Sequence, residues 1–163
     1  MSMGNERQIF NSVDALAEQI LDALHTGVIG VDGWTGAGKT RLARALASKT
    51  SADFFDIDCI LTRGLGRYVD AVPTDKVAQR VGRSQGLLFV SGICLRQILS
   101  NARIEAAKHV YVKRLAVWGW EDEADALREV CALGDESLIM EMRRYHREWR
   151  PHEASDYEFQ RFD

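Results

Sequence analysis

Residues 28–40 read Val-Ile-Gly-Val-Asp-Gly-Trp-Thr-Gly-Ala-Gly-Lys-Thr, and this stretch decides the fold. Residues 28–32 form a short apolar run that ends in an aspartate, which is typical of a buried strand in a parallel sheet. Residues 33–40 match the spacing G-x-x-x-x-G-K-[ST]. Apolar residues at helical spacing follow, among them Leu42 and Leu46. The sequence therefore predicts a buried strand, a glycine-rich turn and a helix, in that order.

Each residue type in this turn has a physical task. Gly36 and Gly38 allow backbone N–H groups to converge on phosphate oxygens. The helix that begins near Lys39 directs its positive end at the same anion. The Lys39 ammonium suits β- and γ-phosphates, and the Thr40 hydroxyl suits Mg²⁺. The predicted nucleotide-binding residues are Gly33, Trp34, Thr35, Gly36, Ala37, Gly38, Lys39 and Thr40, with Thr40 as the metal ligand.

The motif predicts that the chain binds a nucleoside triphosphate as its magnesium complex. A flexible glycine turn with an incidental lysine is the alternative interpretation. ATP is the expected nucleotide, because the sequence contains no Asn-Lys-x-Asp signature for guanine. The side chain of Trp34 either packs on neighbouring helix residues or borders the nucleotide, and the sequence does not select between these.

The remaining chain alternates strand and helix patterns. Apolar strands are expected near residues 54–58, 87–91, 109–113 and 157–162, and residues 121–150 form a charged, helical stretch broken near Gly134. This alternation predicts one α/β domain over residues 1–163, with helices on both faces of a mostly parallel sheet of about five strands. It is the three-layer architecture of P-loop NTPases. Residues 59–86 are the least regular part and are expected to form the substrate region.

Two acids lie at the end of the second predicted strand. Asp56 and Asp58 are two residues apart, so on a continued strand both would point to the same face. The carboxyl ends of parallel strands are where open α/β sheets bind ligands. Asp58 is therefore predicted to orient a substrate hydroxyl or accept its proton, with Asp56 assisting through water or metal. The alternative is a pair of solvated acids or a helix N-cap.

Beyond the loop, the chain resembles the uridine kinase and phosphoribulokinase group of P-loop small-molecule kinases. The resemblance rests on residues 28–40, on Asp56-Ile57-Asp58, on the apolar segments at 87–93 and 110–113, and on the stretch from Tyr145 to Asp156. It implies ATP-dependent phosphoryl transfer to a hydroxyl of a small metabolite, such as a nucleoside, sugar or vitamin. Lys39 and Asp58 are the catalytic residues that it implies.

The chain also departs from that group. Ser91 stands where the family has Glu or Asp, which weakens the hold on magnesium. The family's arginine-bearing lid corresponds to residues 114–134, where only Arg114 and Arg128 are candidate phosphate clamps, so a reduced lid is expected. These departures motivate an alternative function, a nucleotide-binding regulatory protein or slow NTPase with little transferase activity.

Several other side chains are weaker candidates. Asp56, Arg63, Arg67 and Tyr68 are predicted substrate contacts, although solvation of each arginine at the surface is an equal alternative. Arg143 and Arg147 share one helical face at i, i+4, where they either reach the γ-phosphate during closure or form a solvated face.

Composition excludes several classes of partner. The formal net charge is −3, so no basic surface indicates nucleic acid, and no apolar run is long enough to span a membrane. No signal peptide is evident at residues 1–7. Cys59, Cys94 and Cys131 lie far apart in apolar segments, which favours buried thiols in a reducing compartment. A cytoplasmic protein that meets a small-molecule phosphate acceptor is expected, and the sequence gives no indication of oligomeric state.

Overall fold

A computed structural model describes residues 6–62, 67–130 and 137–162. Its sheet has the strand order β1-β7-β5-β2-β4-β3, with all pairs along this path parallel, and β6 pairs antiparallel with β5. The strands are β1 (Gln8–Phe10), β2 (Gly27–Gly33), β3 (Asp53–Asp56), β4 (Leu87–Ser91), β5 (Lys108–Ala116), β6 (Gly119–Trp120) and β7 (Tyr157–Phe162). The predicted α/β class with a mostly parallel sheet is confirmed.

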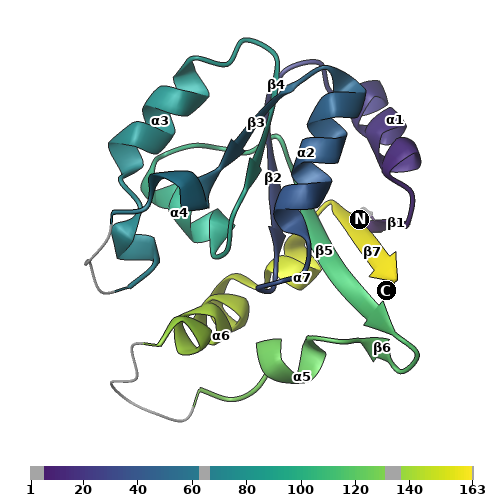
Figure 1. Cartoon of the computed structure of the whole chain (residues 1–163), viewed down its shortest axis with the longest axis vertical. Helices are drawn as coiled ribbons and strands as arrows, with labels where there is room; N and C mark the ends of the chain where they lie inside the picture. Colours follow the sequence, from purple (N-terminus) through teal and green to yellow (C-terminus); the bar gives the residue numbers. More distant parts are fainter. Residues whose placement is uncertain (1–5, 63–66, 131–136, 163) are drawn as a thin grey trace, which may run out of the picture.

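Helices cover both faces of this sheet (Figure 1). The two faces follow from alternation along β2, where Val28 packs into one apolar cluster and Ile29 and Val31 pack into the other. Helices α1 and α2 cover the second cluster, and α3, α4 and α6 cover the first. The helices are α1 (Val13–Ala23), α2 (Lys39–Thr50), α3 (Thr74–Gly82), α4 (Leu95–Asn101), α5 (Glu123–Ala126), α6 (Leu138–Trp149) and α7 (Pro151–Ala154), with short 3₁₀ turns η1 (Ile57–Ile60) and η2 (Val69–Ala71).

The strand count exceeds the prediction of about five, because the described residues form seven strands. The additional strands are β1 and β6, which are three and two residues long and form only through pairing with β7 and β5. Such short segments carry too little periodicity to be detected locally. Two helices lie within residues 121–150, as predicted, but they are shorter than the predicted stretch. Helix α5 has four residues, and α6 begins only at Leu138.

The cysteine prediction holds only in part. Cys94 is buried, whereas Cys59 is exposed on η1, and Cys131 lies outside the described residues. Among the described helices, none is long and apolar enough to cross a membrane.

A buried hydrogen bond ties α6 to the central strand. Asp32, at the end of β2, is fully buried and accepts hydrogen bonds from the Gly33 amide (2.8 Å) and from the Tyr145 hydroxyl on α6. The same Tyr145 oxygen accepts a hydrogen bond from the Arg96 amide at the start of α4 (3.1 Å). Burial raises the pKa of Asp32 to about 6, although both hydrogen bonds and the Lys39 charge act in the opposite direction. Asp32 thus fixes the strand end that precedes the glycine-rich loop.

This carboxyl predicts a specific pH dependence of stability. Since its pKa is raised from 3.8 to about 6 in the folded chain, the native state binds a proton between about pH 6 and pH 4 that the unfolded chain releases. Its contribution to the free energy of unfolding is therefore greatest at low pH and falls as pH rises through 6. Relative to Asp32→Asn, which does not titrate, the wild-type chain should lose about 2 kcal/mol between pH 4.5 and pH 7.5. Urea denaturation across this pH range measures the free energy of unfolding of both proteins. If the wild-type value minus the Asp32→Asn value stays constant or rises with pH, the assignment is contradicted.

Candidate active site

The loop Gly33–Thr40 joins β2 to α2, as the motif requires. A Cβ atom at Gly33 would lie 2.9 Å from the carbonyl oxygen of Val112 on the neighbouring strand β5, so only glycine fits there. Gly38 is the N-cap of α2 and has φ of +98°, a conformation that side chains disfavour. The first N–H groups of α2, which begins at Lys39, lack partners within the helix and point out of its N-terminus. The turn therefore offers converging amide donors to an anion.

Lys39 is held against the loop that it follows. Its side chain is buried, and its Nζ donates a hydrogen bond to the Trp34 carbonyl at 2.8 Å. The same carbonyl accepts the Ala37 amide at 3.1 Å, so one oxygen organises the middle of the loop. Burial lowers the pKa of the Lys39 ammonium, while the charges of Asp32, Asp58 and Asp56 act to raise it. The ammonium is thus held at the loop by the Trp34 carbonyl, and the nearby carboxylates favour its charged form.

The structure shows the packing that was one of the two interpretations of Trp34. Its side chain is buried in the apolar cluster beneath α6 and packs edge-on against His146, with ring centroids 5.4 Å apart. The His146 ring is itself fixed, because Nδ1 donates to the Met142 carbonyl (2.8 Å) and Nε2 accepts from the Tyr111 hydroxyl (2.7 Å). Trp34 therefore anchors the loop to α6 by packing.

Oxygen donors suited to magnesium meet beside the loop. The Thr40 hydroxyl donates to Oδ2 of Asp56 at 3.0 Å, which brings an alcohol and a carboxylate from different elements together. Mg²⁺ is held in such sites by one or two protein oxygens together with phosphate oxygens and water, so this pair fits the ion. Asp56 lies opposite Ser91 in the register of β3 and β4. Ser91 is fully buried, and its Oγ has no hydrogen-bond partner among the described residues. The carboxylate near Thr40 is therefore that of Asp56 on β3, and β4 has a serine at the paired position.

The structure corrects the argument that placed Asp56 and Asp58 on one strand face. Strand β3 ends at Asp56, and Asp58 lies in the 3₁₀ turn η1. Asp56 caps this turn by accepting the Asp58 amide through Oδ1 at 3.0 Å, so the capping alternative also applies to it. The Asp58 carboxylate instead accepts a hydrogen bond from the Tyr68 hydroxyl. Burial and this hydrogen bond raise the pKa of Tyr68, which keeps the phenol protonated as a donor.

A cleft of about 590 Å³ brings the loop and these groups together. The loop contributes Thr35, Gly36, Gly38, Lys39 and Thr40 to its lining, with Arg41 beside them. The opposite wall comes from other segments and consists of Asp58, Leu61, Tyr68, Gly92, Ile93 and Leu138. Of the predicted substrate residues, Tyr68 therefore lies in the cleft and Asp56 beside it. Arg67 is exposed and is not among the residues described as lining the cleft, and Arg63 lies outside the described residues.

Sequence reasoning missed the residue that positions Tyr68. Glu141 on α6 is buried, and its two carboxylate oxygens accept the amides of Tyr68 (2.8 Å) and Val69 (2.9 Å). The only local signal for such a role is that Glu141 is an acid next to Met142 and one helical turn before Tyr145, among the residues that α6 buries. Arg161 on β7 was also missed, and its guanidinium lies against Gly38. No motif indicates this contact, because β7 is far from the loop in sequence. It lies near the loop only because it pairs with β5, which in turn pairs with β2.

The predicted lid residues occupy two different environments. Arg114 lies on β5 and forms a salt bridge with the buried carboxylate of Asp122, across the hairpin that leads to α5. Arg128 follows α5 and lines a second cavity, together with Arg143 and Arg147 of α6. Residues 131–134 of the predicted lid lie outside the described residues.

Comparisons with known proteins establish the fold. The sequence matches no protein-family profile and no curated protein. Among solved structures, the chain is similar to a possible uridine kinase from Bacillus stearothermophilus, with a TM-score of 0.59 and 13% sequence identity over 90% of this chain and 96% of that one. It also matches shikimate kinase from Aquifex aeolicus, with a TM-score of 0.44 and 14% identity over 82% and 86% of the two chains. The chain therefore shares the fold of this possible uridine kinase.

Proposed function

We propose that this chain is a P-loop phosphotransferase that moves the γ-phosphoryl group of ATP, bound with Mg²⁺, to a hydroxyl group of a small neutral metabolite. One observation carries the proposal. A single cleft contains the phosphate-binding loop on one wall and the Asp58–Tyr68 pair on the other, with Thr40 and Asp56 in contact beside the loop. The fold shared with a possible uridine kinase supports the same class of reaction.

The residues of the cleft divide the chemistry between them. The loop amides and the Lys39 ammonium hold the triphosphate and neutralise charge that develops on the transferred group. When bound, Mg²⁺ supplies further neutralisation of the phosphate oxygens, and Thr40 and Asp56 would hold it. Asp58 orients the acceptor hydroxyl and accepts its proton through the carboxylate oxygen that Tyr68 leaves available. Transfer of this kind requires positioning and electrostatics from few side chains.

The acceptor wall favours a neutral molecule. Among its described residues it carries one carboxylate, one phenol, and the aliphatic side chains of Leu61, Ile93 and Leu138. This wall offers hydrogen bonds to hydroxyl groups and an apolar surface, and its described residues include no cation for a phosphate or carboxylate of the acceptor. A hydroxylated metabolite of the nucleoside, sugar or vitamin type fits these properties.

The first prediction concerns the nucleotide. Lys39→Met removes the ammonium and its charge-assisted hydrogen bonds to phosphate, which contribute about 2–3 kcal/mol. The Kd for MgATP should therefore rise roughly 30- to 160-fold. Lys49→Met is the matched control, since Lys49 lies on the same helix in an exposed pair with Asp14 (2.8 Å). Calorimetric titration of the three proteins measures the change. Equal affinities in Lys39→Met and the wild-type chain contradict nucleotide binding by the loop.

The second prediction separates a kinase from a nucleotide-binding regulator. Asp58→Asn removes the proton acceptor but leaves the loop intact, so kcat should fall roughly 10²- to 10⁴-fold. The Kd for MgATP should stay within about threefold of wild type, because Asp58 lies on the turn η1 and is not part of the phosphate loop. Asp70→Asn, an exposed acid on the neighbouring turn η2, is the control.

The assay is ADP release across a panel of neutral hydroxylated metabolites. An Asp58→Asn protein with wild-type turnover contradicts the role of Asp58. A wild-type chain that binds MgATP and phosphorylates no member of the panel contradicts the transferase and favours the regulatory alternative.

A further inference from the structure

A second hollow lies beside α6, apart from the cleft that contains the phosphate loop. It has a volume of about 620 Å³ and lies between α6, the turn into α7 and the segment 126–130 after α5. This volume is within the range of pockets that hold small organic ligands. We call it the arginine cavity, because its lining includes Arg128, Arg143, Arg147 and Arg150.

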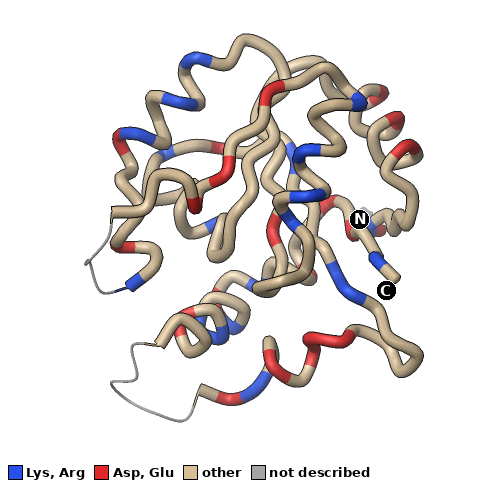
Figure 2. The backbone as a smooth tube through the Cα atoms, viewed as in Figure 1, with Lys and Arg blue, Asp and Glu red and all other residues tan. Residues whose placement is uncertain are grey.

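These arginines converge from two elements. Arg143 and Arg147 lie four residues apart on one face of α6, and Arg128 lines the cavity from the opposite wall. Like charges at this spacing repel each other, and a bound anion would offset that cost. Figure 2 shows basic positions along α6, with acidic positions along the facing segment of α5.

Two acids, Glu129 and Glu153, also line the cavity, and the ion pairs that the structure describes in this region offset only part of the positive charge. Glu153 pairs with Arg150 (2.5 Å), and Asp125 lies 3.9 Å from Arg143, whose Nε also donates to the Asp125 carbonyl. Arg128 and Arg147 form no ion pair or side-chain hydrogen bond with any other residue that the structure describes. Two guanidinium groups therefore remain available at the cavity, and guanidinium recognises phosphate through paired hydrogen bonds.

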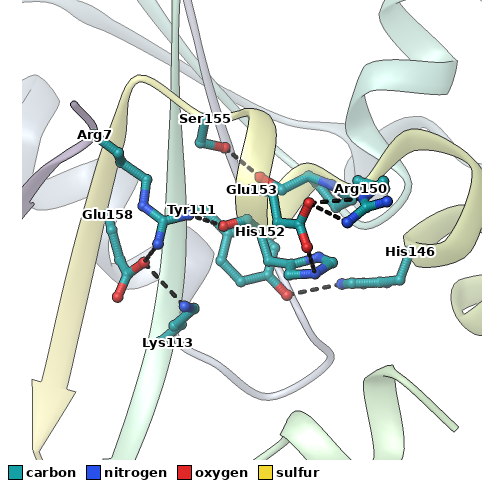
Figure 3. Close-up of polar contacts among 10 residues, drawn as sticks. Arg7, Tyr111, Lys113, His146, Arg150, His152, Glu153, Ser155 and Glu158 are labelled. Atoms are coloured by element: carbon teal, nitrogen blue, oxygen red, sulfur yellow. Dashed lines mark hydrogen bonds and ion pairs between the residues drawn. The ribbon is translucent and has the colours of Figure 1, made fainter. Parts of the chain in front are cut away.

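The floor of the cavity is rigidly constructed. His146 and His152 line it and stack with ring centroids 5.9 Å apart. The His152 carbonyl accepts a hydrogen bond from Arg7, which also pairs with Glu158 of β7 (2.7 Å), so α7 is tied to the sheet (Figure 3). The apolar part of the lining comes from Ala126, Leu127 and Val130. The cavity thus combines fixed rings, an apolar wall and cations, which suits a ligand with both a phosphate and an organic part.

The arginine cavity is distinct from the nucleotide cleft. The two share no lining residue. Leu138 lines the cleft and Arg147 lines the cavity, and residues nine apart on an α-helix face opposite sides. His146 nevertheless forms part of the cavity floor and packs on Trp34 of the loop. A ligand in the cavity would therefore lie one side chain away from the phosphate loop without occupying it.

We propose that the arginine cavity is a second binding site, which takes a phosphorylated small molecule and is independent of the phosphate loop. The proposal goes beyond the transferase function and does not require it. Arg128 and Arg147 are the residues that contact the phosphate.

Anion titrations in the Lys39→Met background isolate this site, because that substitution weakens phosphate binding by the loop. The probes are pyrophosphate and ribose 5-phosphate, titrated by calorimetry without magnesium and at low salt. Lys39→Met should bind at least one probe in the micromolar to low-millimolar range. Adding Arg147→Gln should weaken that binding at least tenfold, and adding Arg128→Gln from the opposite wall should do the same. Arg83→Gln, an exposed arginine at the end of α3, is the control and should leave the Kd unchanged.

Tighter binding of ribose 5-phosphate than of pyrophosphate would assign the apolar wall to the organic part, and the reverse order would assign the site to phosphate groups alone. Both orders support the site. Loss of all binding in Lys39→Met, or equal binding after both arginine substitutions, overturns the proposal. The proposed transferase fails by a separate result, the absence of MgATP binding or of phosphoryl transfer in the wild-type chain.

Discussion

The structure depends on one constraint, the sharp reversal of the chain between the central strand β2 and helix α2. Gly33 must pass within van der Waals contact of the β5 backbone, and Gly38 must take a left-handed conformation before the helix can begin. Only then do the first amides of α2 point at the cleft. The rest of the molecule holds this turn in place. Trp34 anchors it to α6, and the Lys39 ammonium binds its central carbonyl.

Helix α6 links the turn to the acceptor wall. Tyr145 on this helix binds Asp32 at the start of the loop, and Glu141, one turn earlier, binds the amides of Tyr68 and Val69. Tyr68 in turn donates to Asp58. Helix α6 and these hydrogen bonds therefore connect the phosphate-binding end of β2 with Tyr68 and Asp58. Through these contacts, a displacement of α6 would alter both walls of the cleft together.

The sequence was informative where a local pattern has a physical cause. The G-x-x-x-x-G-K-[ST] spacing predicted the strand, turn and helix around residues 28–40, and strand–helix alternation predicted the α/β class. Prediction from the sequence failed where a feature forms only through tertiary contacts. Strand β1 forms by pairing with β7, and Asp58 lies on a 3₁₀ turn because Asp56 caps that turn instead of continuing the strand. Glu141, Arg161 and Asp32 belong to the region of the site through partners far away in sequence, which a single sequence does not reveal.

The central claim is that the backbone amides at the start of α2 bind phosphate. A ¹H–¹⁵N NMR titration with MgADP tests it most directly, because each amide reports separately. The amide signals of Gly36, Gly38, Lys39 and Thr40 should show the largest saturable shifts in the chain. Saturable shifts that spare these four amides, or no shifts at millimolar MgADP, would contradict the claim.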